Sequence, residues 1–278
     1  MGHHYVPQEY LRGFSDPNDP CTIWMYDRQS GCFAHPSIKK VVQEAGYYTE
    51  EIERQLSEIV EKPANKVLDR LRRGERIGDN ERSHLALYVG TMLMRVPRRR
   101  LKAFEMLPAV LEDTISKVTA QVARWSETTT ADPRLVSRRF AEIKRAREKF
   151  IKDPPLEIVE QIRAPWPSGE VLSLVSAMTW RVISPGSAVR FLTSDNPARF
   201  FEAYGLGNPE SELTFPLASD LALVTSWQGA PGETIFVRAR LTIAKEINRR
   251  VASGAERFVF YHACQDWIPK ISNKQPLI

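Results

Sequence analysis

The stretch His3-His4-Tyr5-Val6-Pro7-Gln8-Glu9-Tyr10-Leu11-Arg12-Gly13-Phe14 opens the chain and decides how we expect it to fold. It gathers two imidazoles, an amide, a guanidinium and three large aromatic rings where chain ends are usually polar and poorly ordered. Pro7 suits the first turn of a helix and Gly13 suits its end, which predicts a short helix from about Pro7 to Arg12. We therefore expect this segment to be held inside the folded protein.

Gln8 and Arg12 lie four residues apart on that helix and share one face. Their amide and guanidinium can point into a pocket together. His3 and His4 precede the helix in an extended segment, where neighbouring side chains project to opposite sides. We expect one functional and one structural imidazole, and the sequence leaves open which is which. The alternative is a structural plug in which both histidines are hydrogen-bonded in a polar core.

Two further helices carry candidate residues. Apolar residues at helical spacing between Ile52 and Leu71 predict the first helix, and Pro63 predicts a kink in it beside Glu61. A carboxylate at a kink can line a pocket, which makes Glu61 a candidate. Glu53 lies about 80° from Glu61 around an ideal helix axis, and we interpret it as a solvated carboxylate.

A polar stripe runs beside the apolar stripe of the second helix, predicted from about Asp79 to Val96: His84, Tyr88, Thr91 and Arg95. A guanidinium on a largely buried helix needs an acceptor or an anionic ligand. Arg95 can therefore bind a phosphate or carboxylate of a substrate, or a structural carboxylate such as Asp195. The sequence does not choose between these partners.

Basic residues crowd a later helix, predicted from Pro133 to about Lys152. Only a thin apolar edge accompanies them. A run of charge is usually a solvated face. The alternative is that this helix moves, forms a homodimer or lies against nucleic acid.

The last third of the chain predicts strands. Trp180–Ile183 and Val189–Thr193 are expected to form a hairpin across the turn at Ser184–Ser187, and several short strands follow. We expect an α+β fold: a mainly helical body with a C-terminal, mostly antiparallel β-sheet against which the N-terminal motif packs. Residues 1–278 form one domain in this prediction, with a protruding basic helical insertion around 130–155.

Thr193-Ser194-Asp195-Asn196-Pro197 follows the second of these strands. Short polar side chains before a proline commonly form a turn in which Asp or Asn bonds the backbone. The end of a strand is also where a rigid scaffold presents catalytic carboxylates. Asp195 is therefore our leading acidic candidate, and Asn196 either orients a ligand or holds the turn.

The pattern HHYVPQ-x-YLR-x-F, together with Arg95-Val96-Pro97 and Phe191–Pro197, resembles a large, mainly microbial family catalogued as domain of unknown function 4238. The segments occur in the family's order across nearly the whole chain. The resemblance implies that the N-terminal motif belongs with the Asp195 turn, and that acidic positions recur in the helix of Glu61. It implies no particular activity.

Histidine and carboxylate together can bind a divalent metal and activate water, while arginines offset phosphate charge. We expect a metal-assisted phosphodiester hydrolase that acts on nucleic acid or a nucleotide, with Mg, Mn or Zn held by His4 and Asp195. The catalytic candidates are His3, His4, Asp195 and Glu61, and the substrate-binding candidates are Gln8, Arg12, Arg95 and Asn196. The same residues can act as a metal-free acid–base site. In the non-enzymatic alternative they form a structural polar network, and the protein binds nucleic acid or another protein.

The composition of the chain bears on its cellular compartment, its partners and its enzyme class. The three cysteines, Cys21, Cys32 and Cys264, have no CxxC spacing, which fits a reducing cytoplasm. The net charge of +5 is compatible with nucleic acid without being diagnostic of it. We find neither a signal peptide nor a membrane helix, and we expect no membrane association. The sequence has no GxSxG, P-loop or dinucleotide fingerprint, which argues against those enzyme classes.

Overall fold

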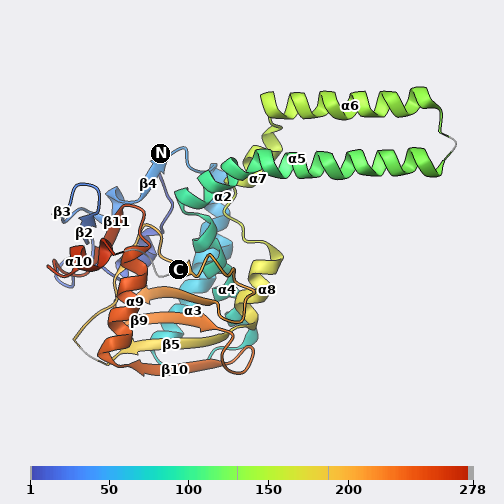
Figure 1. The fold of residues 1–278 in the computed structure, drawn as a ribbon. Helices are drawn as coiled ribbons and strands as arrows, with labels where there is room; N and C mark the ends of the chain where they lie inside the picture. The colour runs from blue at the N-terminus through green and yellow to red at the C-terminus, as the bar shows by residue number, and fades with distance from the viewer. Residues whose placement is uncertain (1, 130, 187, 275–278) are drawn as a thin grey trace. The chain divides into compact units, whose positions relative to one another are not determined.

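The computed structural model describes residues 2–129, 131–186 and 188–274 (Figure 1). The chain divides into two compact units. Unit 1 comprises Met1–Val96 and Pro165–Ile278, and unit 2 comprises Pro97–Ala164. The sequence predicts an insertion around 130–155, and the inserted unit is wider than that, because it includes the whole helix before the basic one. The α+β class is confirmed.

Unit 1 begins with strand β1 (Gly2–His4) and helix α1 (Gln8–Arg12). α1 is the short helix that the opening motif predicts, with Pro7 at its N-cap and Gly13 at its C-cap. β1 pairs antiparallel with β4 (Gln43–Ala45), which follows the short helical turn η1 (Ile38–Lys40). The two histidines therefore lie on a paired strand.

One long helical segment follows β4, and it consists of α2 (Glu50–Gln55), the π-helical turn η2 (Leu56–Glu61) and α3 (Lys62–Arg72). The Thr49 side chain caps its start by accepting a hydrogen bond from the Ile52 N–H. The π-helical turn ends at Glu61, and Pro63 lies in the first turn of α3; the kink expected at Pro63 stays a prediction. α4 (Asp79–Met94) packs against α3 and against α8 (Gly169–Ala177).

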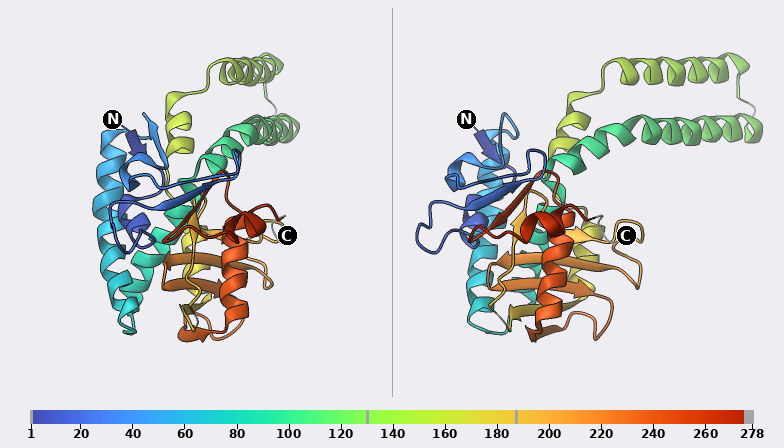
Figure 2. Two further views of the ribbon diagram at one scale, coloured as in Figure 1. Left: turned by 90° about the vertical axis from the view of Figure 1, so that its left-hand side faces the viewer. Right: turned by 60° about the vertical axis from the view of Figure 1, so that its left-hand side comes forward.

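A five-stranded sheet runs in the order β10-β5-β9-β8-β7. Its strands are β5 (Thr179–Pro185), β7 (Arg199–Phe200), β8 (Glu212–Ala218), β9 (Leu221–Ser226) and β10 (Thr234–Ala239). β10 pairs parallel with β5, and every other pair in the sheet is antiparallel. In the left view of Figure 2 this sheet lies between α3 and α4 on one side and α9 (Leu241–Ser253) on the other.

Alternate residues of this sheet serve different cores, as expected for a sheet covered on both faces. Leu221 and Leu223 of β9 belong to the main core, which includes residues of α3 and α4. Ala222 and Val224 belong to a smaller core that includes Ile247 of α9. Both faces of β9 are therefore buried.

A four-stranded antiparallel sheet, in the order β3-β2-β11-β6, joins the two ends of unit 1. Its strands are β2 (Trp24–Asp27), β3 (Cys32–Ala34), β6 (Thr193–Ser194) and β11 (Phe258–Tyr261), and α10 (Ile268–Ser272) follows β11. The predicted hairpin across Ser184–Ser187 is wrong. β5 pairs with β9 and β10, whereas β6 pairs with β11 in the other sheet.

Tyr10 connects α1 to the five-stranded and the four-stranded sheet. Its ring stacks on Phe215 of β8, with the ring centroids 5.3 Å apart. Its hydroxyl lies 2.7 Å from the Pro216 carbonyl oxygen and 2.7 Å from Thr193 Oγ1. Because the phenol has one proton, which it donates to the carbonyl, the Thr193 hydroxyl is the donor to Tyr10. The N-terminal motif thus packs against the sheets, as predicted.

Unit 2 consists of α5 (Pro97–Thr128), α6 (Pro133–Lys152) and α7 (Leu156–Arg163). α5 contacts both α6 and α7. Although the structure describes every residue of α5 and α6, none of them is buried. Within the described residues of the whole chain, no helix combines the length and the apolarity that crossing a membrane requires.

The chain returns from unit 2 to α4. Pro167 packs against Gly90 of α4, where a Cβ would lie 2.9 Å from two side-chain carbons of Pro167. Real Cβ atoms essentially never come so close to another atom. Gly90 therefore permits a close approach between α4 and the segment that re-enters unit 1.

Tyr10→Phe should lower the free energy of unfolding by about 1–3 kcal/mol, because it leaves the buried Pro216 carbonyl and Thr193 hydroxyl without their partner. Urea unfolding measures this loss. Tyr204→Phe is the matched control, since Tyr204 is 51% exposed, and it should unfold like the wild type. Equal stability of Tyr10→Phe and the wild type would contradict the role assigned to the hydroxyl.

Candidate functional site

Arg95 lies directly after α4, and its side chain is only 1% exposed. Its Nη1 donates to Glu61 Oε1 at 2.8 Å. Its Nη2 donates to the backbone oxygen of His4 at 2.7 Å. One guanidinium therefore joins the end of α4 to η2 and to β1, which are far apart in the sequence.

Two tyrosines bond the backbone of Arg95. The Tyr47 and Tyr48 hydroxyls donate to its carbonyl oxygen at 2.9 Å and 3.4 Å. A carbonyl at a helix C-terminus lacks a partner within the helix, so these bonds supply one. The Tyr48 N–H also donates to Nδ1 of the half-buried His3 at 3.3 Å. This bond places the proton of a neutral His3 ring on Nε2.

Glu53 and Glu61 meet near the same guanidinium. An ideal α-helix would separate them by about 80° around its axis. The π-helical turn η2 lies between them, and its wider turns advance less per residue, which reduces that offset. Glu53 interacts electrostatically with Arg95, Glu61 and His3. The π-helical turn thus reduces the angle between two carboxylates that regular helical spacing would place further apart.

We call six residues the Arg95 cluster: His3, His4, Glu53, Glu61, Thr91 and Arg95. Four of its buried polar atoms have no hydrogen-bond partner, namely His4 Nδ1, Glu53 Oε2, Thr91 Oγ1 and Arg95 Nε. Only six such side-chain atoms occur in the part of the chain that the structure describes. Each such group costs about 1–3 kcal/mol. Their concentration points to a place for water or for a ligand group.

Burial shifts the pKa of two residues of the Arg95 cluster, His4 and Glu53. Burial lowers the pKa of His4, and the Arg95 charge lowers it further, against a backbone hydrogen bond at Val41 and the Glu61 charge. Burial also raises the pKa of Glu53, opposed by Arg95 and assisted by Glu61. The cluster therefore combines a neutral imidazole with a carboxyl group that keeps its proton to higher pH. Such a combination can act as base and acid.

Gln8 and Arg12 have no described hydrogen bond to the cluster. Arg12 is exposed and forms an ion pair with Glu9 on the same helix. Gln8 is half-buried. Substrate binding by these two residues stays a prediction.

The Asp195 turn is sealed within the fold. The Asp195 carboxylate accepts hydrogen bonds from three consecutive backbone N–H groups, at residues 256–258, over 2.7–2.9 Å. Burial raises the pKa of Asp195, while these three N–H groups act to lower it. Asn196 Nδ2 donates to the Gly254 carbonyl oxygen at 3.2 Å. In this structure both side chains hold the connection between α9 and β11.

The residues predicted to hold a metal lie in separate surroundings. His4 belongs to the Arg95 cluster, whereas Asp195 is bonded to the α9–β11 connection. No group of three or more His, Cys, Asp or Glu side chains is arranged to hold a metal ion within the described ranges. A divalent ion shared by His4 and Asp195 stays a prediction.

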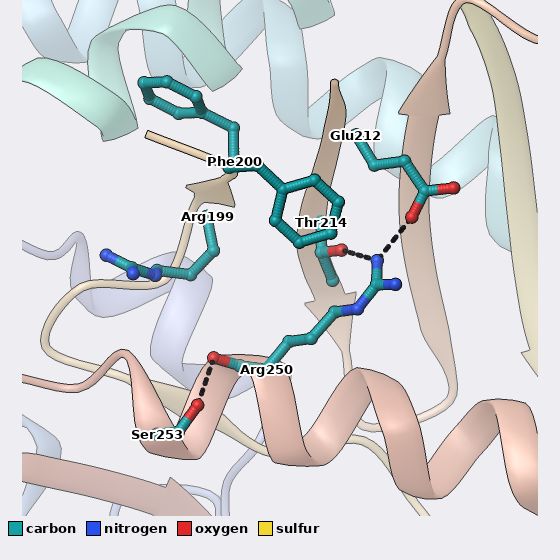
Figure 3. A pocket seen from close by; sticks show the side chains of 7 residues that line it. Arg199, Phe200, Glu212, Thr214, Arg250 and Ser253 are labelled. Atoms are coloured by element: carbon teal, nitrogen blue, oxygen red, sulfur yellow. Dashed lines mark hydrogen bonds and ion pairs between the residues drawn. The ribbon is translucent and has the colours of Figure 1, made fainter. Parts of the chain in front are cut away.

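Two hollows lie along α9. The larger, about 580 Å³, has Lys245, Trp267 and Lys270 in its lining. The smaller, about 20 Å³, is shown in Figure 3. Arg250 lies across it and donates to Glu212 Oε2 at 2.6 Å and to Thr214 Oγ1 at 3.4 Å. These contacts tie α9 to β8.

Sequence reasoning missed two members of the Arg95 cluster. Thr91 belongs to the predicted polar stripe of α4, and that stripe is the signal that could have identified it. Glu53 gives no such signal, because its approach to Arg95 depends on the π-helical turn.

Arg95→Met should destabilise the protein by about 3–5 kcal/mol, because it leaves the Glu61 charge and the His4 carbonyl without their partner. Denaturant unfolding measures the loss. The double variant Arg95→Met/Glu61→Gln should lose less than the sum of the single variants, with a coupling of about 0.5–3 kcal/mol. Arg54→Met, at an exposed ion pair with Glu58, is the control and should change stability by about 1 kcal/mol or less. Additive effects at Arg95 and Glu61 would contradict the pairing.

The ion pair between Asp27 and Arg257 predicts a dependence on pH. The hydrogen bonds from Arg257 lower the pKa of Asp27 from 3.8 to about 2. The stabilisation is therefore complete above pH 3.8 and is lost as the pH falls toward about 2. Asp27→Asn should reduce this acid-side loss in unfolding experiments at stepped pH. The exposed Asp220→Asn should keep the wild-type profile, and an unchanged profile in Asp27→Asn would refute the assignment.

Comparison with known proteins places the chain in a family. Residues 2–264 match the family model described as "Protein of unknown function (DUF4238)". No curated protein and no solved structure matches the chain. The match covers both the N-terminal motif and the Asp195 turn. The chain therefore belongs to the DUF4238 family.

Proposed function

We propose that this protein is a hydrolase that cleaves phosphodiester bonds by general acid–base catalysis at the Arg95 cluster. The proposal is carried by two carboxylates in different surroundings beside one guanidinium. Glu61 forms an ion pair with Arg95, with Arg95 Nη1 2.8 Å from Glu61 Oε1, and its side chain is 22% exposed, so solvent can reach it. Glu53 is half-buried, and burial raises its pKa, so it keeps a proton more readily. Titratable groups held in such opposed surroundings are typical of acid–base pairs.

The proposed reaction assigns one proton transfer to each carboxylate. Glu61 takes a proton from water as the water oxygen bonds to phosphorus. The bond from phosphorus to the leaving oxygen breaks, and Glu53 gives that oxygen its proton. His3 Nε2–H donates a hydrogen bond to a non-bridging phosphoryl oxygen. Arg95 is a positioning residue, because it is buried and acts through Glu61 and through its charge.

The charge of the chain is compatible with an anionic substrate. The net charge of +5 favours association with anions. Phosphodiesters of nucleic acids or nucleotides are anions with a hydrolysable bond. Cys21, Cys32 and Cys264 are exposed free thiols, which fits the cytoplasmic setting that we propose.

A metal-assisted form of the reaction is a separate prediction, with Mg, Mn or Zn held by His4 and Asp195. Metal analysis of the purified, tag-free protein tests it. Loss of stoichiometric metal in folded His4→Ala and Asp195→Ala variants would support it. Absence of metal binding in the wild type would refute it.

A non-enzymatic role is the second candidate. The enclosed Arg95 side chain and the sealed Asp195 turn are what a structural polar network requires. In this case the protein binds nucleic acid or another protein, or a homodimer forms through α5 and α6, and no turnover is measured. Light scattering of the full chain reports the oligomeric state.

Glu53→Gln and Glu61→Gln should each lower kcat/KM for bis-para-nitrophenyl phosphate by about 100-fold or more, because each removes one proton transfer. Activity of the wild type should fall as the pH rises through the pKa of Glu53, since the acid must be protonated, and this limb should vanish in Glu53→Gln. Glu58→Gln, on the same π-helical turn but paired with Arg54, is the control and should retain activity. Wild-type protein without activity on this ester, DNA or RNA would reject the hydrolase.

A further inference from the structure

Unit 2 carries the whole net charge of the chain. It contains 15 of the 39 Lys and Arg residues and 10 of the 34 Asp and Glu residues, so unit 1 is neutral overall. Helix α6 alone has eight basic and two acidic residues. The positive charge is therefore concentrated on one helix of 20 residues.

Five of the basic residues of α6 share one face. At 100° per residue they fall within an arc of about 60°, and we call them the α6 stripe: Arg134, Arg138, Arg145, Lys149 and Lys152. All five are exposed. The half-buried apolar residues of the helix lie on the opposite side: Val136, Phe140, Ile143 and Phe150. At 1.5 Å per residue the stripe extends over about 27 Å.

Little negative charge neutralises the stripe. Arg138 Nε forms an ion pair with Glu142 Oε1 at 3.0 Å. For the other four residues, the described part of the chain supplies no carboxylate within ion-pair distance; Arg145 Nε donates to the Ala141 carbonyl oxygen instead. Exposed cations in a row repel one another, and a polyanion removes that repulsion.

We propose that the α6 stripe binds the sugar–phosphate backbone of double-stranded nucleic acid without regard to base sequence. Along the duplex axis, the phosphates of one strand are about 3.4 Å apart. The stripe therefore spans about eight of them. The stripe consists of Lys and Arg alone, which contact phosphates, and has no amide side chain to read a base edge. It also has no aromatic ring on which unpaired bases stack, which favours duplex over single strand.

An acidic membrane surface is the competing polyanion. A helix that lies in a membrane interface exposes a broad apolar face beside its cations. In α6, which contacts α5, four apolar residues are instead half-buried, and the two exposed large ones, Leu135 and Ile151, lie about 160° apart around the helix axis and form no common face. Nucleic acid is therefore the better match.

This inference deepens the proposed function, since it names polymeric nucleic acid as the substrate class. Binding at the stripe does not require catalysis. The two proposals can therefore fail separately, and binding and hydrolysis are measured on the same preparations.

The test is fluorescence anisotropy of the full chain with labelled 20-base-pair DNA and RNA duplexes at several salt concentrations. Four unneutralised cations predict a slope of log K against log salt near −3.6, at about 0.9 per phosphate contact. The variant Arg134→Gln/Arg145→Gln/Lys149→Gln/Lys152→Gln should bind at least about tenfold more weakly and with a slope near zero. Gln is a good helix former, so α6 should persist in circular dichroism.

The matched control is Lys39→Gln/Lys40→Gln/Lys62→Gln/Lys66→Gln, which removes four exposed cations from unit 1. It should keep wild-type affinity and slope. Equal losses in the two variants would overturn the proposal in favour of unspecific attraction. Binding to phosphatidylserine vesicles without duplex binding would overturn it in favour of a membrane. Duplex binding that is lost in the stripe variant, with no hydrolysis by the wild type, would uphold the stripe and reject the hydrolase.

Discussion

The buried guanidinium of Arg95 is the interaction on which the arrangement of unit 1 depends. Moving a charge out of water is tolerated only when a counter-charge and hydrogen bonds replace the lost hydration. Glu61 supplies the charge and the His4 carbonyl supplies a further acceptor. Because each partner comes from a different part of the chain, the N-terminal strand, the π-helical turn and the end of α4 are positioned together.

Arg82 is a second buried arginine, and its guanidinium is satisfied in a different way. Its guanidinium donates to the carbonyl oxygens of Ser176 and Met178 and lies 3.9 Å from the centroid of the Trp180 ring. No carboxylate pairs with it in the described structure, and burial lowers the pKa of Arg82 to about 10. Backbone oxygens and the Thr234 hydroxyl thus give every nitrogen of the Arg82 guanidinium an acceptor, whereas Arg95 retains a buried Nε without a partner. Incomplete pairing distinguishes the candidate site from the purely structural arginine.

Local sequence signals predicted α1, the burial of the N-terminal motif and the polar stripe of α4. Those signals depend on residues close together in the chain, such as Pro7 and Gly13. The pairing of β6 with β11 was not predictable in this way, because it depends on residues more than sixty positions apart, as Thr193 and Phe260 are. Glu53 was missed because apolar spacing does not reveal a π-helical turn. The role of Asp195 as a catalytic or metal-binding carboxylate stays a prediction, and its three backbone donors could not be predicted locally because they come from a distant connection.

The contact between Gly90 and Pro167 has a consequence for how the family can diverge. The chain leaves unit 1 after Val96 and is back against α4 by Pro167, about 9 Å along the helix axis from its departure. The packing of α4 therefore requires only that the two ends of the inserted segment meet there. The length of the segment between these two ends does not enter the packing of α4 against Pro167. This is the position where we expect chain length to vary most between species.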